Sequence, residues 1–526
     1  MKPFDAKGIF LPSADVNGLR QLAVRGAGVT VMTSALGTAV QIVATVVLAR
    51  LLTPSDFGLV TMVTTFSLLL VNFGLNGFTE AILQRDQLDH FLTSNLFWIN
   101  VGVGLVLTAV FAGSGSLMAR FYGNPRVASA ALGVSLSICI TSTSVLHLSL
   151  LKRAMRFSVV SANDILAAVI SVAVSILLAW AGCGYWALIT GVVVRPLSQS
   201  IGAWTLCRWV PSFPRRVPGT AAMTRFALNI YGRFSFNYFA RNMDNLLVGW
   251  RFNAQSLGFY KKAYDLFALS SSQLVAPLTS VAVSALSRLN KTSEQYRRYL
   301  LNSLDVMALV GMGLGAILTL AGRDVIRILL GPGWEPAARI FMFFGPGVGI
   351  MLLYNTHGWI HLSIGRPDRW FRWVVIEFIV TGLLLVLGLA WGPAGIALAW
   401  TASFWILTIP AFWYAGKPIG FGVAPILHLI WRYIFAALLA TGACLLIFQG
   451  SILNPAESAV AALARMIKLS AVFGIFYLGA VVLLHASLSP LLRVRRLCVE
   501  MLSRRNAPSS STVPVTNASA EPIPTP

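Results

Sequence analysis

The chain has 526 residues, of which 56% are hydrophobic and only 11% are charged, and its mean hydropathy is +0.75. An ordinary soluble domain carries roughly 25% charged residues, so this composition excludes a soluble globular protein and indicates an integral membrane protein. The formal charge of +22 would suit a nucleic-acid partner, but most of the cations lie in alternate connections between apolar segments, which is the pattern of membrane topology.

Fourteen apolar segments recur along the chain, each about the 20 residues that cross the hydrocarbon as a helix. Because backbone groups in lipid must be bonded within their own segment, and strand periodicity is missing, the predicted class is an all-α polytopic membrane protein. The expected spans are 29–49, 57–77, 93–118, 127–150, 159–180, 184–206, 226–249, 258–284, 301–321, 338–362, 371–391, 395–415, 427–449 and 464–486.

Charge bias between the connections predicts the orientation. The N-terminal segment, every second connection and the C-terminal tail hold most of the 40 Lys and Arg residues, so both termini are expected in the cytoplasm. The five cysteines lie far apart without a CxxC motif, and His357 and His361 have no third ligand near them along the helix. No disulfide framework, metal site or cofactor is therefore expected.

A weak internal repeat divides the chain. Arg50-LLTPSDF-Gly58 follows the first span and Arg251-FNAQSL-Gly258 follows the seventh. With six spans per unit, both copies have the same orientation, which predicts a parallel repeat about an axis along the membrane normal; a chance likeness of two short loops is the alternative. The expected units are a cytoplasmic segment 1–28, an N-lobe 29–207, a linker 208–225, a C-lobe 226–415, two added spans 416–490, and a basic, then disordered, tail 491–526.

Three segments resemble the polysaccharide transporter family of bacterial oligosaccharide flippases, part of the multidrug, oligosaccharidyl-lipid and polysaccharide exporter superfamily. They are VLARLLTPSDFGLVTM (47–62), NFGLNGFTEAILQR (72–85) and the block 242–289. The resemblance covers about residues 22–490. It implies a two-lobed, V-shaped exporter with a central cavity, which moves undecaprenyl-diphosphate-linked sugar repeat units across the bacterial inner membrane for exopolysaccharide, capsule or lipopolysaccharide O-antigen synthesis.

The seventh span carries a polar stripe. Every fourth residue of 229-NIYGRFSFNYFARNMDNLLVG-249 is polar, namely Asn229, Arg233, Asn237, Arg241 and Asn245. Residues at this spacing follow one side of a helix. An arginine at mid-bilayer costs at least about 2.5–3.5 kcal/mol, so the stripe is expected to face the bundle interior or a watery cavity.

Guanidinium groups bind phosphate oxygens in bidentate fashion and stay charged when desolvated. We therefore predict that Arg233 and Arg241 hold the diphosphate of a lipid-linked sugar, while the asparagines contact sugar hydroxyls. Asp244 can pair with Arg241 at i, i+3, which leaves Arg233 for first contact with the substrate. The alternative is that both arginines extend to the interfaces or bind carbonyls of neighbouring helices.

Further charged residues are secondary candidates. Arg195, directly before Pro196, is expected to line the cavity or to pair with Asp164. Arg50 could receive the diphosphate on release, although extension of its side chain to the interface is the simpler explanation. Asp164, Asp244 and Glu377 could couple transport to the proton gradient or merely neutralise arginines.

Several functions compete with the preferred flippase. A drug exporter of related fold would need acids rather than arginines in its cavity, and a lipid II flippase would also use arginines on a diphosphate. A membrane polymerase or ligase for lipid-linked sugars would need a long periplasmic loop, which the expected spans do not leave; an enzyme is therefore not predicted. The expected partners are the lipid-linked oligosaccharide, the bilayer and the polymerase or export machinery, not nucleic acid.

Overall fold

The computed structural model describes residues 3–5, 7–11, 16–85, 87–289, 293–450 and 458–493. Within these ranges the regular structure is helical, apart from two isolated bridges, Phe4 with Phe10 and Ile9 with Asp89. The predicted all-α class is therefore confirmed.

The helices of the first half alternate with short turns. They are α1 (Val16–Leu51), α2 (Pro54–Gln84), α3 (His90–Gly113), α4 (Gly115–Tyr122), α5 (Arg126–Ser142), α6 (Val145–Arg153), α7 (Phe157–Trp180) and α8 (Tyr185–Cys207). The second half comprises α9 (Thr220–Arg251), α10 (Ala254–Arg288), α11 (Glu294–Leu320), α12 (Gly322–Leu329), α13 (Glu335–Tyr354), α14 (His357–Ser363), α15 (Pro367–Gly388), η1 (Leu389–Trp391), α16 (Gly392–Gly416), η2 (Lys417–Ile419), α17 (Ala424–Ile447) and α18 (Ala459–His485).

Ten stretches of the described chain are long and apolar enough to cross a membrane. One of them, Pro367–Ile419, contains both α15 and α16. Each of the fourteen expected spans falls on a helix or a pair of consecutive helices, but α8, α9 and α10 do not qualify by apolar length. Fourteen crossings therefore stay a prediction, which depends on counting these three more polar helices as spans.

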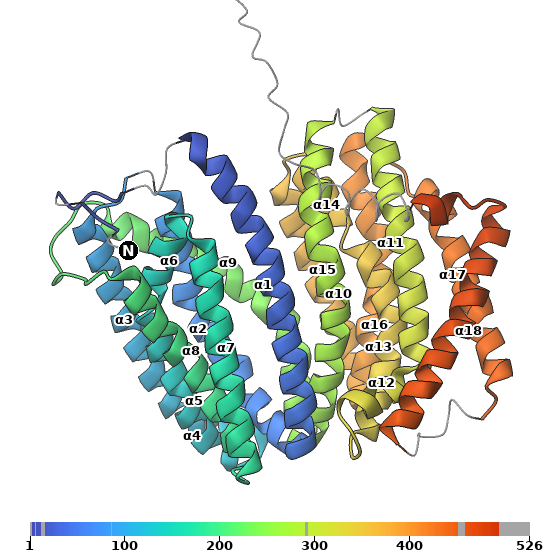
Figure 1. The fold of residues 1–526 in the computed structure, drawn as a ribbon, viewed down its shortest axis with the longest axis horizontal. Coiled ribbons are helices and arrows are strands. Elements are labelled where there is room, and N and C mark those ends of the chain that lie inside the picture. Colours follow the sequence, from blue (N-terminus) through green and yellow to red (C-terminus); the bar gives the residue numbers. More distant parts are fainter. Residues whose placement is uncertain are drawn as a thin grey trace, which may run out of the picture.

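Two groups of helices lie side by side (Figure 1). In the first, α5 packs on α2, α3 and α8, and α7 packs on α1 and α8. In the second, α13 packs on α10, α11 and α16, and α15 packs on α16. The helix α2 joins the groups through extensive contacts with α9 and α10. The last two helices, α17 and α18, contact each other, α11 and α12 at the outer edge.

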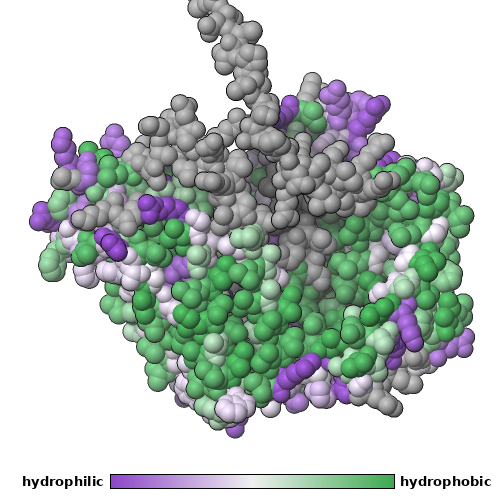
Figure 2. Space-filling view, viewed as in Figure 1, coloured by the Kyte–Doolittle hydropathy of each residue, from purple (hydrophilic) through white to green (hydrophobic). Residues whose placement is uncertain are grey.

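The surface has the character expected for a lipid-facing protein. Figure 2 shows hydrophobic side chains over the middle of the visible face and hydrophilic ones toward the upper and lower rims. Leu177, Leu387 and Leu483 are 63%, 63% and 81% exposed. Such extended apolar exposure is incompatible with water and fits contact with acyl chains.

Glycines let α11 and α13 approach closely. A Cβ atom built on Gly311 would lie 2.9 Å from the Gly349 carbonyl oxygen, and one on Gly315 would lie 2.9 Å from the Gly345 carbonyl oxygen. Both distances are shorter than real Cβ contacts allow. Small residues serve the same purpose between other membrane helices, so these glycines set the distance between the two backbones.

Candidate functional site

The helices α2 and α10 cross at one end of the molecule, and the crossing relates the two copies of the sequence repeat. A Cβ atom on Gly58 would lie 1.6 Å from the Ala254 carbonyl oxygen, and one on Gly258 would lie 1.8 Å from the Pro54 carbonyl oxygen. Gly58 and Gly258 are 200 residues apart, and so are Pro54 and Ala254, so each glycine meets the residue equivalent to the one that lies four positions before it, and the contact is reciprocal. Only residues without a Cβ atom allow backbones to meet this closely.

The same numbering shift relates the helix starts. Thr53 caps α2 by accepting a hydrogen bond from the backbone N–H of Asp56, and Asn253 caps α10 by accepting one from the N–H of Ser256. The arginines quoted for the repeat are not equivalent by this shift, because Leu51, not Arg50, corresponds to Arg251. The capped starts and the glycines, rather than the arginines, are what the two copies share.

Further contacts close the same end. The indole Nε1–H of Trp334 donates to the Ala49 carbonyl oxygen at 3.0 Å, and the indole packs edge-on against the rings of Phe57 and Phe259. Arg50 donates from Nη2 to the Ile328 carbonyl oxygen at 2.9 Å. The arginine considered for substrate release therefore joins the end of α1 to α12 in this conformation.

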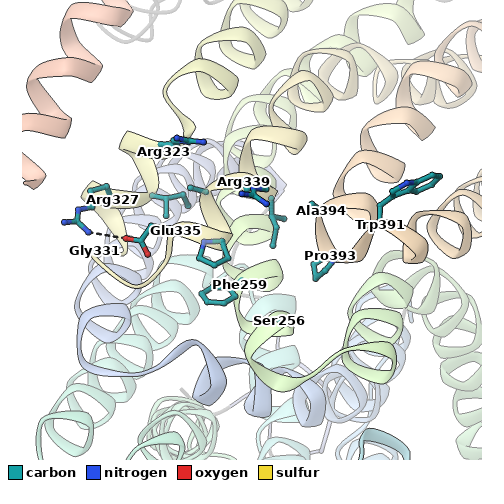
Figure 3. Close-up of a pocket in the computed structure, with 14 residues that line it drawn as sticks. Ser256, Phe259, Arg323, Arg327, Gly331, Glu335, Arg339, Trp391, Pro393 and Ala394 are labelled. Carbon is teal, nitrogen blue, oxygen red and sulfur yellow. Dashed lines mark hydrogen bonds and ion pairs between the residues drawn. The ribbon is translucent and has the colours of Figure 1, made fainter. Parts of the chain in front are cut away.

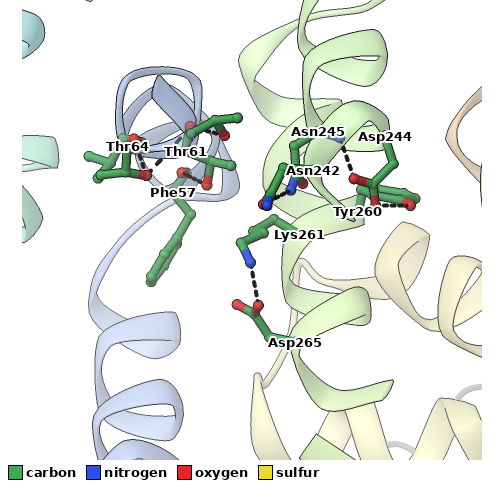
Figure 4. A network of polar contacts seen from close by, with 11 residues as sticks. Phe57, Thr61, Thr64, Asn242, Asp244, Asn245, Tyr260, Lys261 and Asp265 are labelled. Carbon is green, nitrogen blue, oxygen red and sulfur yellow. Dashed lines mark hydrogen bonds and ion pairs between the residues drawn. The ribbon is translucent and has the colours of Figure 1, made fainter. Parts of the chain in front are cut away.

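Asp244 of α9 is completely buried between α10 and α16 (Figure 4). Its Oδ2 atom accepts hydrogen bonds from the Tyr260 hydroxyl at 2.7 Å and the Trp400 Nε1–H at 3.1 Å. Among the described residues it has no ion pair with Arg241, so the expected pairing is not formed. Residues at i and i+3 lie about 60° apart around a helix, and here Asp244 faces the neighbouring helices while Arg241 is exposed.

Two lysines of α10 complete this polar cluster. Lys261 donates from Nζ to Asp265 Oδ1 at 2.6 Å. Lys262 is 8% exposed, and its Nζ lies 4.1 Å from the centroid of the Phe57 ring on α2. Within the described part of the chain, no carboxylate lies within ion-pair distance of Lys262. The sequence analysis missed these residues, although two adjacent lysines inside an expected span are a visible signal.

Arg241 faces the second group of helices. It interacts electrostatically with Glu377 on α15, Tyr354 on α13 and Tyr264 on α10. The Tyr354 hydroxyl hydrogen-bonds the Glu377 carboxylate and accepts a hydrogen bond from Trp373 Nε1 at 2.9 Å. Arg241 therefore lies beside other protein groups, as expected for a cation that cannot face acyl chains.

The other residues of the predicted polar stripe differ in their exposure. Asn229 is exposed, whereas Asn245 is 2% exposed and donates to Asn242 Oδ1 at 3.4 Å. The side chains of Arg233 and Asn237 lie outside the described part of the structure. Of the described members of the stripe, Asn229 and Arg241 are therefore exposed and Asn245 is buried, and a shared binding surface stays a prediction.

Arg195 pairs with Asp164, which was the structural alternative for this arginine. Arg195 Nη2 lies 3.3 Å from Asp164 Oδ1, and Gln199 donates to the same oxygen at 3.2 Å. The two charged side chains are about half exposed and join α7 to α8. The pair neutralises two of the charges considered for binding and coupling.

A family model and curated relatives both connect this chain with polysaccharide biosynthesis. The model of a family described as "Polysaccharide biosynthesis protein" matches residues 47–339, more than half of the chain. Teichuronic acid biosynthesis protein TuaB of Bacillus subtilis is 25% identical over 60% of this chain and 64% of its own length, slightly under two thirds. Succinoglycan biosynthesis transport protein ExoT of Rhizobium meliloti is 22% identical over 67% of this chain and 72% of its own.

Solved structures agree on the fold. The lipid II flippase MurJ in an inward closed conformation has a TM-score of 0.67 at 14% identity, covering 86% of this chain and 99% of its own. An inward-facing multidrug resistance MATE transporter of the MOP superfamily has a TM-score of 0.56 at 13% identity, covering 73% of this chain and 94% of its own. The chain belongs to the family described as "Polysaccharide biosynthesis protein", and its fold resembles those of the flippase and the transporter above.

Proposed function

We propose that this protein is a flippase that moves undecaprenyl-diphosphate-linked oligosaccharide repeat units across the bacterial inner membrane. It is a transporter and not an enzyme, and its termini lie in the cytoplasm. The units 29–207 and 226–415 act as two lobes around a central cavity and open alternately to either side, while 416–490 is an addition. Membership of a family of polysaccharide biosynthesis proteins, and similarity to a succinoglycan biosynthesis transport protein, support the substrate class.

The observation that carries the mechanism is the position of two cations, Lys262 and Arg241, between the two groups of helices. Lys262 is buried at the contact of α10 with α2, where it lies over the Phe57 ring; Asp265 attracts it, but within the described residues no carboxylate forms an ion pair with it. Arg241 lies on the preceding helix, α9, and interacts electrostatically with the half-buried carboxylate of Glu377. A buried charge without a partner is costly, and a diphosphate supplies two compensating negative charges.

In this proposal the diphosphate contacts Arg233 first and is then held by Arg241 and Lys262. Asn229, Asn237 and Asn245 contact the sugars. Arg50 is freed for the departing diphosphate only when the contact with Ile328 opens. Glu377 is the best-placed acid for ion coupling, since Asp164 pairs with Arg195 and Asp244 is bonded by Tyr260 and Trp400.

The proposal is tested with purified protein in liposomes that contain a fluorescent polyprenyl-diphosphate oligosaccharide. Flipping is followed by adding a quencher on one side of the membrane and measuring the loss of fluorescence. We expect Arg233→Ala, Arg241→Ala and Lys262→Gln to abolish flipping, while Arg233→Lys recovers part of it because lysine keeps the charge but loses the bidentate geometry. Lys468→Gln, which removes an exposed cation of α18, is the matched control and should flip normally.

Two results would contradict the proposal. Normal flipping by all three charge-removing variants would show that these cations do not hold the diphosphate. Faster flipping of lipid II than of the oligosaccharide-linked lipid would reassign the substrate. Cellular polymer export and the amount of each variant in the membrane are measured in parallel, so that loss of protein is not mistaken for loss of transport.

A further inference from the structure

A second cationic pocket lies at the closed end of the molecule, outside the α2–α9–α10 cluster. It has a volume of about 610 Å³ and is formed by the first turns of α10, by α12, and by the starts of α13 and α16 (Figure 3). Arg323 and Arg327 of α12 line it from positions i and i+4, which share one face of a helix, and Arg339 of α13 lies across from them.

The charges of this pocket are not balanced. Glu335 is the acid among its lining residues, and it lies 3.4 Å from Arg327 Nη1. Within the described ranges, no carboxylate lies within 4.0 Å of Arg323 or Arg339. Two of the three arginines are therefore available to an anion. Guanidinium groups favour phosphate oxygens because their N–H groups match two oxygens at once.

The remaining wall of the pocket is apolar and meets the lipid-facing surface. Phe259, Ile326 and Ile340 line its inner part, and Trp391 at its edge is 72% exposed. Leu387 on α15, four residues before Trp391, is 63% exposed. Exposed tryptophan beside arginine is typical of the membrane interface. A free inorganic anion would gain nothing from the apolar wall, whereas an amphiphile would use both parts.

We propose that this pocket binds the phosphate group of a membrane lipid. Arg323 and Arg339 contact the phosphate, and the apolar wall receives the first segment of the lipid chain. Two lipids share this chemistry: an anionic glycerophospholipid of the bilayer and a polyprenyl phosphate carrier. The site does not depend on the proposed transport activity, because its residues are separate from Arg241 and Lys262.

Native mass spectrometry of the full chain in detergent tests the site, with phosphatidylglycerol, phosphatidylcholine and undecaprenyl phosphate added separately. We expect an anionic lipid to bind more tightly than phosphatidylcholine, whose headgroup carries no net charge. Each cation near a membrane surface strengthens anionic-lipid binding about fivefold, so Arg323→Gln with Arg339→Gln should weaken it at least tenfold. Arg339→Gln alone, at an exposed position, should fold normally and weaken binding about fivefold.

Arg126→Gln is the matched control, because Arg126 is exposed at the same end of the molecule and lies outside the pocket. Its lipid binding should equal that of the unchanged protein. A loss confined to phosphatidylglycerol identifies the bilayer as the source of the ligand, and a loss confined to undecaprenyl phosphate identifies the carrier. Equal binding of phosphatidylcholine, equal effects of the pocket and control variants, or equally tight binding of soluble glycerol 3-phosphate would each overturn the proposal.

Discussion

Replacing Gly58 by alanine tests whether the α2–α10 crossing holds one end of the protein shut. The added Cβ atom would lie 1.6 Å from the Ala254 carbonyl oxygen and 2.5 Å from its carbonyl carbon. Ordinary contact begins at 3.4 Å, so the two helices must separate by about 1.8 Å. Because the obstructing atoms belong to the backbone, no change of rotamer relieves the overlap.

This overlap raises the free energy of the conformation in which the two helices cross. Overpacking a tight contact typically costs about 1–3 kcal/mol, and a bias of that size shifts a two-state equilibrium about 5–150-fold. If this end opens during transport, Gly58→Ala therefore favours the open state. Gly258→Ala should act in the same direction, since its Cβ atom would lie 1.8 Å from the Pro54 carbonyl oxygen.

Cysteine labelling in membranes measures the shift. The native cysteines are replaced, and Thr61→Cys on α2, at a position 7% exposed in the closed structure, reports access for a membrane-impermeant maleimide added on the side of the crossing. We expect faster labelling in both glycine variants. Gly102→Ala on α3 is the control, because nothing lies within 4 Å of its added Cβ atom. Labelling and transport unchanged from this control, with normal amounts of protein, would refute the reasoning.

The remaining predictions concern one hydrogen bond and two ion pairs. Trp334→Phe keeps an aromatic ring between Phe57 and Phe259 but removes the hydrogen bond to Ala49, which is worth about 1 kcal/mol. Labelling of Thr61→Cys should therefore rise about fivefold. Unchanged labelling would mean that this hydrogen bond does not help to close this end. Arg465→Gln leaves the buried Asp324 carboxylate without its ion-pair partner and should cost about 3–5 kcal/mol of stability, measured by thermal unfolding in detergent. Arg298→Gln, in a pair whose side chains are 76% and 68% exposed, should cost less than about 1 kcal/mol, and equal melting of the two variants would contradict the prediction.

Helix positions could be predicted from the sequence because they depend on local patterns. Apolar runs of sufficient length indicate α3, α7 and α18 without reference to any other segment. The likeness of the two loops was recognised from an arginine, a short polar turn and a glycine, whereas the structure shows that the features at equivalent positions are the caps Thr53 and Asn253 and the glycines Gly58 and Gly258. Their contact with each other was not predictable, since nothing local shows that the two glycines meet.

Partners of charged residues were harder to predict. Sequence spacing suggested that Asp244 pairs with Arg241, but Tyr260 is sixteen residues away and Trp400 is 156 residues away. Helical spacing shows which residues share a face; it does not show which neighbouring helix lies opposite that face. The Asp164–Arg195 pair was within reach of prediction because α7 and α8 are consecutive helices.

The crossing and the buried cation belong to one arrangement. Phe57 directly precedes Gly58 on α2, and Lys262 follows Gly258 by one helical turn on α10. Close approach of the glycines therefore brings the Lys262 ammonium group to 4.1 Å from the Phe57 ring. A cation over a ring gains about 2 kcal/mol or more only while both are desolvated, so a separation of the helices wide enough to admit water or an anion would remove this stabilisation from the lysine. In the proposed mechanism, opening this end and exposing the cation would be one movement, and a bound diphosphate would therefore influence the conformation directly.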